Sequence, residues 1–190
     1  AARLFASALN EGGDAEEQRR LESHMDASLR AAEELLDGLL DISRLDAGVL
    51  QPQLSDFDAA DLLRELHAQY APTAVQRNLD LRVHAPSSMP VHSDRRLLRR
   101  ALQNFIGNAV RYAQTGGVLL AARPRGDVIS LEVWDTGPGI PSNHLEQIFE
   151  EFHRFDQPGE RGQRGLGLGL SICQRISGVL GHPLHVRSEQ

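Results

Sequence analysis

The sequence predicts a two-layer α/β fold, an α+β sandwich in which helices cover one face of a mixed sheet, with a helical hairpin at the N-terminal end. Three observations favour this prediction. A long and broadly apolar helical stripe precedes residue 48, strand and helix patterns alternate after it, and a polar, glycine-rich segment lies near the C-terminal end. We therefore divide the 190 residues into a partial hairpin over 1–48 and an α/β domain over 49–190.

Composition excludes several classes of function. The 26 acidic residues outnumber the 20 basic ones, and a net charge of -6 argues against nucleic-acid binding, which needs a basic face. Cys173 is the only cysteine, so no intramolecular disulfide can form, and we expect its thiol to be buried as a small hydrophobic group. No apolar run approaches the roughly 20 residues of a membrane span, so this segment is expected to be cytoplasmic and without membrane contact.

The N-terminal region is predicted to be helical. Residues Ala1–Asn10 are typical of the end of one helix, and Gly12 and Gly13 interrupt it. A second helix is expected over Ala15–Asp46, with Asp14 as its cap. Its apolar stripe is too broad for a lone surface helix, which predicts a four-helix bundle built by two chains, and His24 is expected to face solvent.

The α/β domain follows from alternating strand and helix patterns. The segment 86–90 is predicted to be a loop, and 156–165 a mobile loop. Asp58 is the expected cap of the first helix, and Ser93 or Asp94 that of the second. Strands are predicted over 53–57, 79–84, 118–123, 128–135 and 184–187, and helices over 59–77, 95–113 and 166–180.

The first candidate site lies on the second of these helices. Asn104 and Asn108 are four residues apart and share one helix face. Their amide oxygens are suitable ligands for Mg²⁺, which commonly shares its oxygen ligands with a substrate phosphate, and Arg111 could meet a phosphate. Asparagines that only cap a helix or face water would give the same pattern, so this pair alone leaves both interpretations open.

The second candidate site follows a strand end. Asp135 is followed by Gly137 and Gly139, which place a carboxylate beside a tight turn without obstructing side chains. A carboxylate accepts hydrogen bonds only, so it suits an exocyclic amine such as that of adenine. An ordinary turn after a strand remains the alternative.

Two further segments complete the pattern. Phe149 and Phe152 could anchor the base of the mobile loop, and Arg154 could reach a phosphate, although a short amphipathic helix would also explain this segment. The run Gly165–Ile172, with glycines at every second position, enters a helix, where backbone N–H groups and the helix dipole favour an anion. It matches neither the dinucleotide-binding fingerprint nor the P-loop, and by itself it is weak.

In combination the four segments are specific. Their order, from the asparagine pair through Asp-x-Gly-x-Gly and Phe-x-x-Phe to Gly-x-Gly-x-Gly, resembles the nucleotide-binding boxes of sensor histidine kinases. These enzymes belong to the Bergerat-fold ATPases, with gyrase, the Hsp90 chaperones and MutL. The phenylalanine box and Asn104, where the other branches have a catalytic glutamate, resemble the kinase branch. Leu39–Gly48 resembles the end of the second dimerisation helix of the same kinases.

The resemblance implies a role for each matching residue. Asn108 would be the Mg²⁺ ligand and Asp135 would bind the adenine amine. Gly165, Gly167 and Gly169 would line the triphosphate of ATP, and residues 155–164 would form the lid. The implied catalytic residues are Asn104, Arg111 and Arg154, and the remaining nucleotide-binding residues are Tyr112, Gly137, Gly139, Ile140, Phe155, Leu166, Leu168 and Leu170.

The resemblance also implies an activity. The parent protein would transfer the γ-phosphoryl group of ATP to a histidine and relay it to the aspartate of a response-regulator receiver domain, working as a homodimer through the hairpin. The family's phosphoacceptor histidine precedes the segment that resembles Ala1–Asn10, its closing strand follows the region of Leu184, and Arg111 stands where the family usually has lysine. The alternative is a nucleotide-sensing or partner-docking module without kinase activity.

Overall fold

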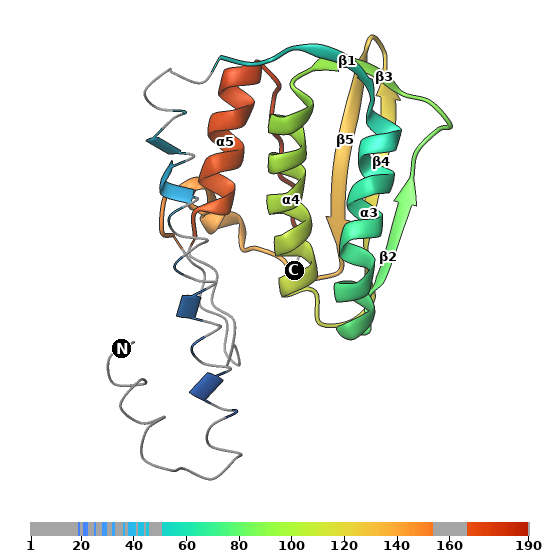
Figure 1. The fold of residues 1–190 in the computed structure, drawn as a ribbon. Helices are drawn as coiled ribbons and strands as arrows, with labels where there is room; N and C mark the ends of the chain where they lie inside the picture. Colours follow the sequence, from blue (N-terminus) through green and yellow to red (C-terminus); the bar gives the residue numbers. More distant parts are fainter. Residues whose placement is uncertain are drawn as a thin grey trace.

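The computed structural model describes residues 51–153 and 167–189, together with a set of single positions between Arg19 and Leu45 (Figure 1). Every described position between Arg19 and Leu45 is helical, which agrees with the predicted second helix of the hairpin. The segment Ala1–Asn10 and His24 lie outside the described residues.

The helices and strands of the α/β domain follow in chain order. They are β1 (Ser55–Asp58), α3 (Ala59–Gln76), β2 (Asp80–His84), β3 (Pro90–Ser93), α4 (Arg95–Tyr112), β4 (Gly117–Arg125), β5 (Val128–Asp135), the 3₁₀ turns η1 (Ser142–His144) and η2 (Gln147–Phe149), and α5 (Gly169–Leu180).

The strands form a mixed sheet, which confirms the predicted fold class. β4 lies in the middle of the order β2-β4-β5, parallel to β2 and antiparallel to β5. β1 and β3 form a separate antiparallel pair. The predicted hairpin of β4 and β5 is present, and β5 has the predicted bounds.

Helices α3, α4 and α5 lie side by side on one side of the sheet (Figure 1). Alternate residues of β4 point into the core between the sheet and the helices, because successive side chains of a strand face opposite sides. The largest apolar group of the molecule is therefore shared by both layers. Its buried members include Leu62, Leu63, Leu66, Leu102, Ile106, Ala109, Val110, Val118, Leu120 and Ala122.

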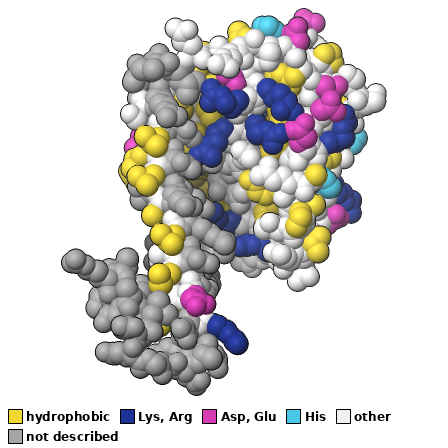
Figure 2. Space-filling view, viewed as in Figure 1, with side chains coloured by type: hydrophobic (Ala, Val, Ile, Leu, Met, Phe, Trp, Pro, Cys, Tyr) yellow, Lys and Arg dark blue, Asp and Glu magenta, His cyan; other side chains and the backbone are white. Residues whose placement is uncertain are grey.

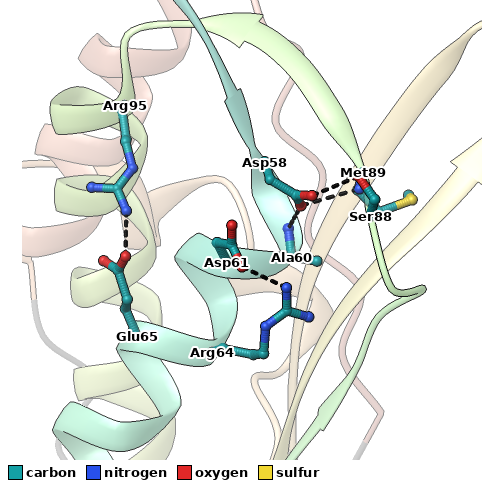
Figure 3. A network of polar contacts seen from close by, with 8 residues as sticks. All are labelled: Asp58, Ala60, Asp61, Arg64, Glu65, Ser88, Met89 and Arg95. Atoms are coloured by element: carbon teal, nitrogen blue, oxygen red, sulfur yellow. Dashed lines mark hydrogen bonds and ion pairs between the residues drawn. The ribbon is translucent and has the colours of Figure 1, made fainter.

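Asp58 starts α3, as the sequence predicts. Its carboxylate accepts hydrogen bonds from the backbone N–H of Ala60 at 2.8 Å and of Met89 at 3.1 Å, and from the Ser88 hydroxyl at 2.7 Å (Figure 3). The Ser88 hydrogen bond lowers the pKa of Asp58 most, while burial acts against it and the backbone donors reinforce it. One side chain thus caps the helix and fixes the loop before β3.

Ion pairs connect the exposed sides of α3 and α4. Glu65 of α3 receives a hydrogen bond from Arg95 at 2.6 Å (Figure 3). It also receives one from Arg99, and both arginines lie on the first turns of α4. These groups are partly exposed, so solvent screens the pairs and they add little to stability. They fix the relative orientation of the two helices rather than hold them together.

The hairpin helix packs against α4 and α5. Ile42 and Leu45 are buried in a second apolar cluster with Leu97 of α4 and with Leu168 and Ile172 at the start of α5. A side chain at Gly38 would place its Cβ 3.1 Å from Leu168 Cδ1, so the glycine lets the hairpin helix lie close to the start of α5. Of the described helices, none is both long enough and apolar enough to cross a membrane.

Three predictions about the elements were wrong. Pro90–Ser93 forms β3, where the sequence predicts a loop followed by a helix cap, because this strand is stabilised by pairing with the distant β1. Residues 182–189 form neither helix nor strand, so the predicted strand over 184–187 is absent there. Helix α5 begins at Gly169, three residues later than predicted, and in the phenylalanine segment the described residues form the 3₁₀ turn η2, not the amphipathic α-helix that was the alternative interpretation.

Asp94, not Ser93, caps α4, and its replacement should destabilise the fold. Its side chain is 1% exposed and accepts from the backbone N–H of Leu97 at 3.0 Å and of Gln53 at 2.8 Å. Burial raises the pKa of Asp94, but these donors and Arg96 outweigh it, so the pKa lies below its usual 3.8. We expect Asp94→Ala to lower the free energy of unfolding at neutral pH by about 1–2 kcal/mol.

The pH dependence of this difference checks its cause. Because the folded pKa is lowered, the contribution of the Asp94 carboxylate is complete above its ordinary pKa and is lost as the pH falls through the folded value. Urea unfolding of the two proteins should therefore show a difference that shrinks on acidification below about pH 4. The control is Asp61→Ala, which removes an exposed carboxylate and should change little. A difference that is independent of pH would contradict this account.

Candidate nucleotide-binding site

Helix α4 brings the asparagine pair to the start of α5. Asn104 and Asn108 are both half-buried on α4. A Cβ at Gly169 would lie 3.2 Å from Asn104 Oδ1, so the first residue of α5 lies directly against this amide. Asn104 Nδ2 is buried and has no hydrogen-bond partner among the described residues. The Asn104 side chain nevertheless lies close enough to the Cys173 thiol to lower the pKa of that group, so the thiol is the partner that the buried amide faces inside the protein.

Cys173 lies one turn further along α5, behind Asn104. Its thiol donates to the backbone oxygen of Ala101 at 3.5 Å. Burial raises the pKa of Cys173 to about 12, although Asn104 and Arg100 act in the opposite direction. The thiol is therefore neutral and unreactive at physiological pH, as predicted for a buried small hydrophobic residue.

Asp135 is the last residue of β5 and is exposed. Its Oδ1 accepts a hydrogen bond from the backbone N–H of Gly137 at 2.8 Å. A Cβ at Gly137 would lie 2.6 Å from Asp135 Oδ1, so a larger residue there would displace this carboxylate from its present position. This bond occupies one carboxylate oxygen, and the other remains able to accept from a ligand.

The turn after Asp135 is tied to the C-terminal segment. Gly139 has a φ of 75°, which favours glycine. The backbone N–H of Ile140 donates to the Ser188 hydroxyl at 2.7 Å. No local pattern indicates Ser188 as a supporting residue, because its hydroxyl meets the turn only in the folded chain, across 48 positions.

The phenylalanine and glycine segments are in contact through their backbones. The N–H of Phe152 donates to the carbonyl of Gly167 at 3.1 Å. A Cβ at Gly167, where φ is 74°, would lie 2.8 Å from the carbonyl oxygen of His153, so no larger residue fits. Phe152 is 56% exposed, and the loop that it was predicted to anchor lies outside the described residues, so this role stays a prediction.

Helix α5 begins within the glycine run. The first N–H groups of a helix have no partner within it, and at α5 they belong to the run that starts at Gly169. Leu168 is 3% exposed, and its carbonyl accepts from the backbone N–H of Ile172 and from the Ser171 hydroxyl. Leu170 is half-buried. The alternating leucines thus hold the glycines in place, and Leu168 connects them to the hairpin helix.

The remaining predicted residues fall into two groups. Arg111 and Tyr112 are half-buried in the last turn of α4, next to the turn that follows Asp135. Arg154, Phe155, Gly165 and Leu166, and the predicted lid between them, lie outside the described residues.

An open groove of about 420 Å³ lies elsewhere, on the outer side of α5 and η2. It contains none of the predicted nucleotide-binding residues. Three of its side chains are carboxylates, which repel a phosphate, so we do not assign a nucleotide to it. Its lining residues are Glu146, Phe149, Glu150, Glu151, Gln174 and Arg175.

The start of α5, whose first N–H groups have no partner within the helix, lies against Asn104 and fits a phosphate-bearing ligand. Comparison with known proteins agrees: residues 93–190 match the family described as histidine kinase-, DNA gyrase B- and HSP90-like ATPase. The chain belongs to this family. Within it, the sensor histidine kinase RcsC of Escherichia coli K12 is 28% identical over 172 residues, which cover 90% of this chain and 18% of the relative.

Solved structures of the family agree with the fold. Full-length ShkA in complex with AMPPNP is 31% identical, with a TM-score of 0.72, over 91% of this chain and 36% of that one. The histidine kinase ThkA in complex with the response regulator TrrA shares the fold, with a TM-score of 0.70 and 20% identity, over 91% of this chain and 49% of that one. The chain therefore contains the catalytic ATP-binding domain of a sensor histidine kinase and spans less than half of these three proteins.

Proposed function

We propose that the protein transfers the γ-phosphoryl group of ATP to a histidine, from which the group passes to an aspartate of a response-regulator receiver domain. The observation that carries this proposal is the meeting of Asn104 with Gly169 at the start of α5. This contact joins two segments of the proposed site. By resemblance, the asparagine segment would bind Mg²⁺ and the glycine segment the phosphates of ATP. The kinase names of the family relatives support the reaction type.

Residues of α4 and α5 would bind the charged end of the nucleotide. Asn108 would provide an oxygen ligand to Mg²⁺, and Asn104 would hydrogen-bond near the phosphates. Bound Mg²⁺ supplies neutralisation of the phosphate charge. The backbone N–H groups from Gly167 to Leu170 and the Arg111 guanidinium would orient the triphosphate, so that catalysis rests on positioning and electrostatics. Asn104, Arg111 and Arg154 are the proposed catalytic residues.

Asp135 would select the base. Its free carboxylate oxygen would accept from the exocyclic amine of adenine, with the pocket shaped by Gly137, Gly139 and Ile140. An exposed carboxylate that is already oriented by a 2.8 Å hydrogen bond supports this role, because little ordering is left for binding to complete. Phe155, Gly165 and Leu166 complete the proposed site by resemblance alone.

The proposed division of the chain is a hairpin over 1–48 and a catalytic domain over 49–190, in a cytoplasmic part of the parent protein. A homodimer would form through the hairpin, where apolar side chains follow one side of the helix (Figure 2). Four leucines are exposed there by 40% or more, which is unusual for a stripe that faces only water. They are Leu29, Leu36, Leu39 and Leu40.

Calorimetric titration with ATP, with and without Mg²⁺, tests the proposal. We expect Mg²⁺-dependent binding at micromolar to sub-millimolar concentrations, and at least about tenfold weaker binding by Asp135→Asn, which cannot offer the same charged acceptor. A protein that also carries the phosphoacceptor histidine should then incorporate the γ-phosphate. Absence of ATP binding would contradict the proposal. ATP binding without phosphorylation of the histidine would favour a nucleotide-sensing module. Rapid hydrolysis of ATP would favour an ATPase of the gyrase or Hsp90 type.

A further inference from the structure

Thr136, the residue after Asp135, connects the end of β5 to the loop between α4 and β4. Its hydroxyl donates to the carbonyl of Thr115 at 2.5 Å and accepts from the backbone N–H of Gly117 at 2.9 Å. Its own backbone N–H donates to the carbonyl of Gly117 at 3.2 Å. Three hydrogen bonds from one residue thus fix the α4–β4 loop against the turn that carries Asp135.

The α4–β4 loop has the shape that this hydroxyl requires. A Cβ at Gly116, where φ is 82°, would lie 2.5 Å from Thr136 Oγ1. Glycine is therefore needed there both for the backbone conformation and for the space that the threonine fills. An ordinary solvent-exposed threonine would place no such demand on its neighbours.

The loop joins the two halves of the proposed site. It follows Tyr112, the last residue of α4, and Asn108 lies one turn before Tyr112. On the other side, Thr136 is bonded directly to Asp135 in the chain, and a Cβ at Gly137 would lie in van der Waals contact with the carbonyl carbon of Tyr112, at 3.7 Å. The Thr136 hydroxyl therefore sets where the base-binding carboxylate lies relative to the helix that would bind the metal and phosphates.

We propose that Thr136 is a positioning residue for base recognition: its hydroxyl holds Asp135 at the distance from α4 at which the carboxylate meets the 6-amino group of a purine nucleotide. The proposal rests on the proposed function, since it assigns a cause to the selectivity of the same site. Removing the hydroxyl leaves Asp135 and the backbone bond between Thr136 and Gly117 intact, but it breaks the side-chain bonds that hold the α4–β4 loop against the turn. Selectivity for the amine should then fall, while phosphate binding by α4 and α5 persists.

Discrimination between ATP and ITP, in which a carbonyl replaces the 6-amine, tests this role. Calorimetry with Mg²⁺ should show that the wild-type protein prefers ATP by about tenfold or more, because the charged acceptor is unpaired with ITP. Thr136→Val keeps the shape of the side chain but removes the hydroxyl. We expect its preference for ATP to fall to about threefold or less, because Asp135 is then less well ordered before the nucleotide binds. Affinity for Mg²⁺–tripolyphosphate should stay within about twofold of wild type.

The control is Thr136→Ser, which keeps the hydroxyl and should retain most of the preference. Thr136→Ala removes the hydroxyl by a second route and covers the case in which the valine variant does not fold. A wild-type ATP preference in both the valine and alanine variants would overturn the role of Thr136, even if their melting temperatures fall. A wild-type protein that binds both nucleotides equally, or an unchanged preference in Asp135→Asn, would instead refute the base-binding role of Asp135 and, with it, that of Thr136.

Discussion

Replacement of Asn108 by alanine should weaken Mg²⁺-dependent ATP binding by about 100-fold or more, while the fold remains intact. The side chain is half-buried on α4, one turn after the amide that meets Gly169. Mg²⁺ binds few protein ligands besides substrate oxygens and water, so the loss of one ligand is not easily compensated. Loss of a residue that only supports a metal ligand typically costs about 10- to 100-fold, and loss of the ligand itself should exceed that. Calorimetric titration of both proteins gives the ratio directly.

The cation dependence distinguishes a metal ligand from a general contact. In wild type, removal of Mg²⁺ with a chelator should weaken ATP binding strongly, whereas in Asn108→Ala the chelator should have little further effect. Asn143, an exposed asparagine in η1, provides the matched control, because Asn143→Ala removes an amide far from α4 and α5 in the chain. If Asn108→Ala binds Mg²⁺–ATP as tightly as wild type, the metal assignment is wrong.

The helices and the β4–β5 hairpin were predictable because their signals are local. Apolar spacing defined α3 and α4 to within a residue or two, and Asp58 lies where a capping side chain is expected. In β5 every second residue from Ile129 to Val133 is apolar and packs against the core, and the strand ends at Asp135 before glycines, so both its bounds were correct. In each case the residues that determine the structure lie within a few positions of one another.

Strand β3 and the segment 182–189 were missed because strand pairing is not local. Pro90–Ser93 has no strand pattern of its own and is a strand through its hydrogen bonds to β1, more than 30 residues earlier. Residues 184–187 do have an alternating pattern, yet the segment forms no ladder among the described residues. Propensity therefore predicts where a strand can form, and the availability of a partner decides whether it does.

The candidate site divides in the same way. The residue types of the four segments were evident from their order in the sequence, and the structure brings Asn104 of the first segment against Gly169 of the last. Their contacts were not evident, because the approach of Gly169 to Asn104 depends on how α5 packs against α4. Thr136 was overlooked for a related reason: its hydroxyl matters only through a loop that lies 20 residues away in the sequence.

Packing at one residue of that loop leads to the largest expected effect on stability. Gly117 is the first residue of β4 and pairs with Asp80, the first residue of the parallel strand β2. A Cβ at Gly117 would lie 2.2 Å from the carbonyl oxygen of Asp80 and 3.1 Å from its carbonyl carbon. Both are backbone atoms, so no rotation of a side chain can relieve the contact, and the two strands would have to separate where their pairing begins.

We therefore expect Gly117→Ala to lower the free energy of unfolding by about 2–4 kcal/mol, in the range of severe overpacking with loss of backbone hydrogen bonds. Urea titration can follow it through the fluorescence of Trp134, which is the only tryptophan and lies on β5, the strand next to β4. Gly178→Ala on α5 is the matched control: its Cβ would meet nothing within 4 Å, and alanine in a helix should raise stability by about 0.5–1 kcal/mol. If Gly117→Ala and wild type unfold at the same urea concentration, strands β2 and β4 can separate at this end without loss of stability. The close β2–β4 contact would then not be what holds the α4–β4 loop in place.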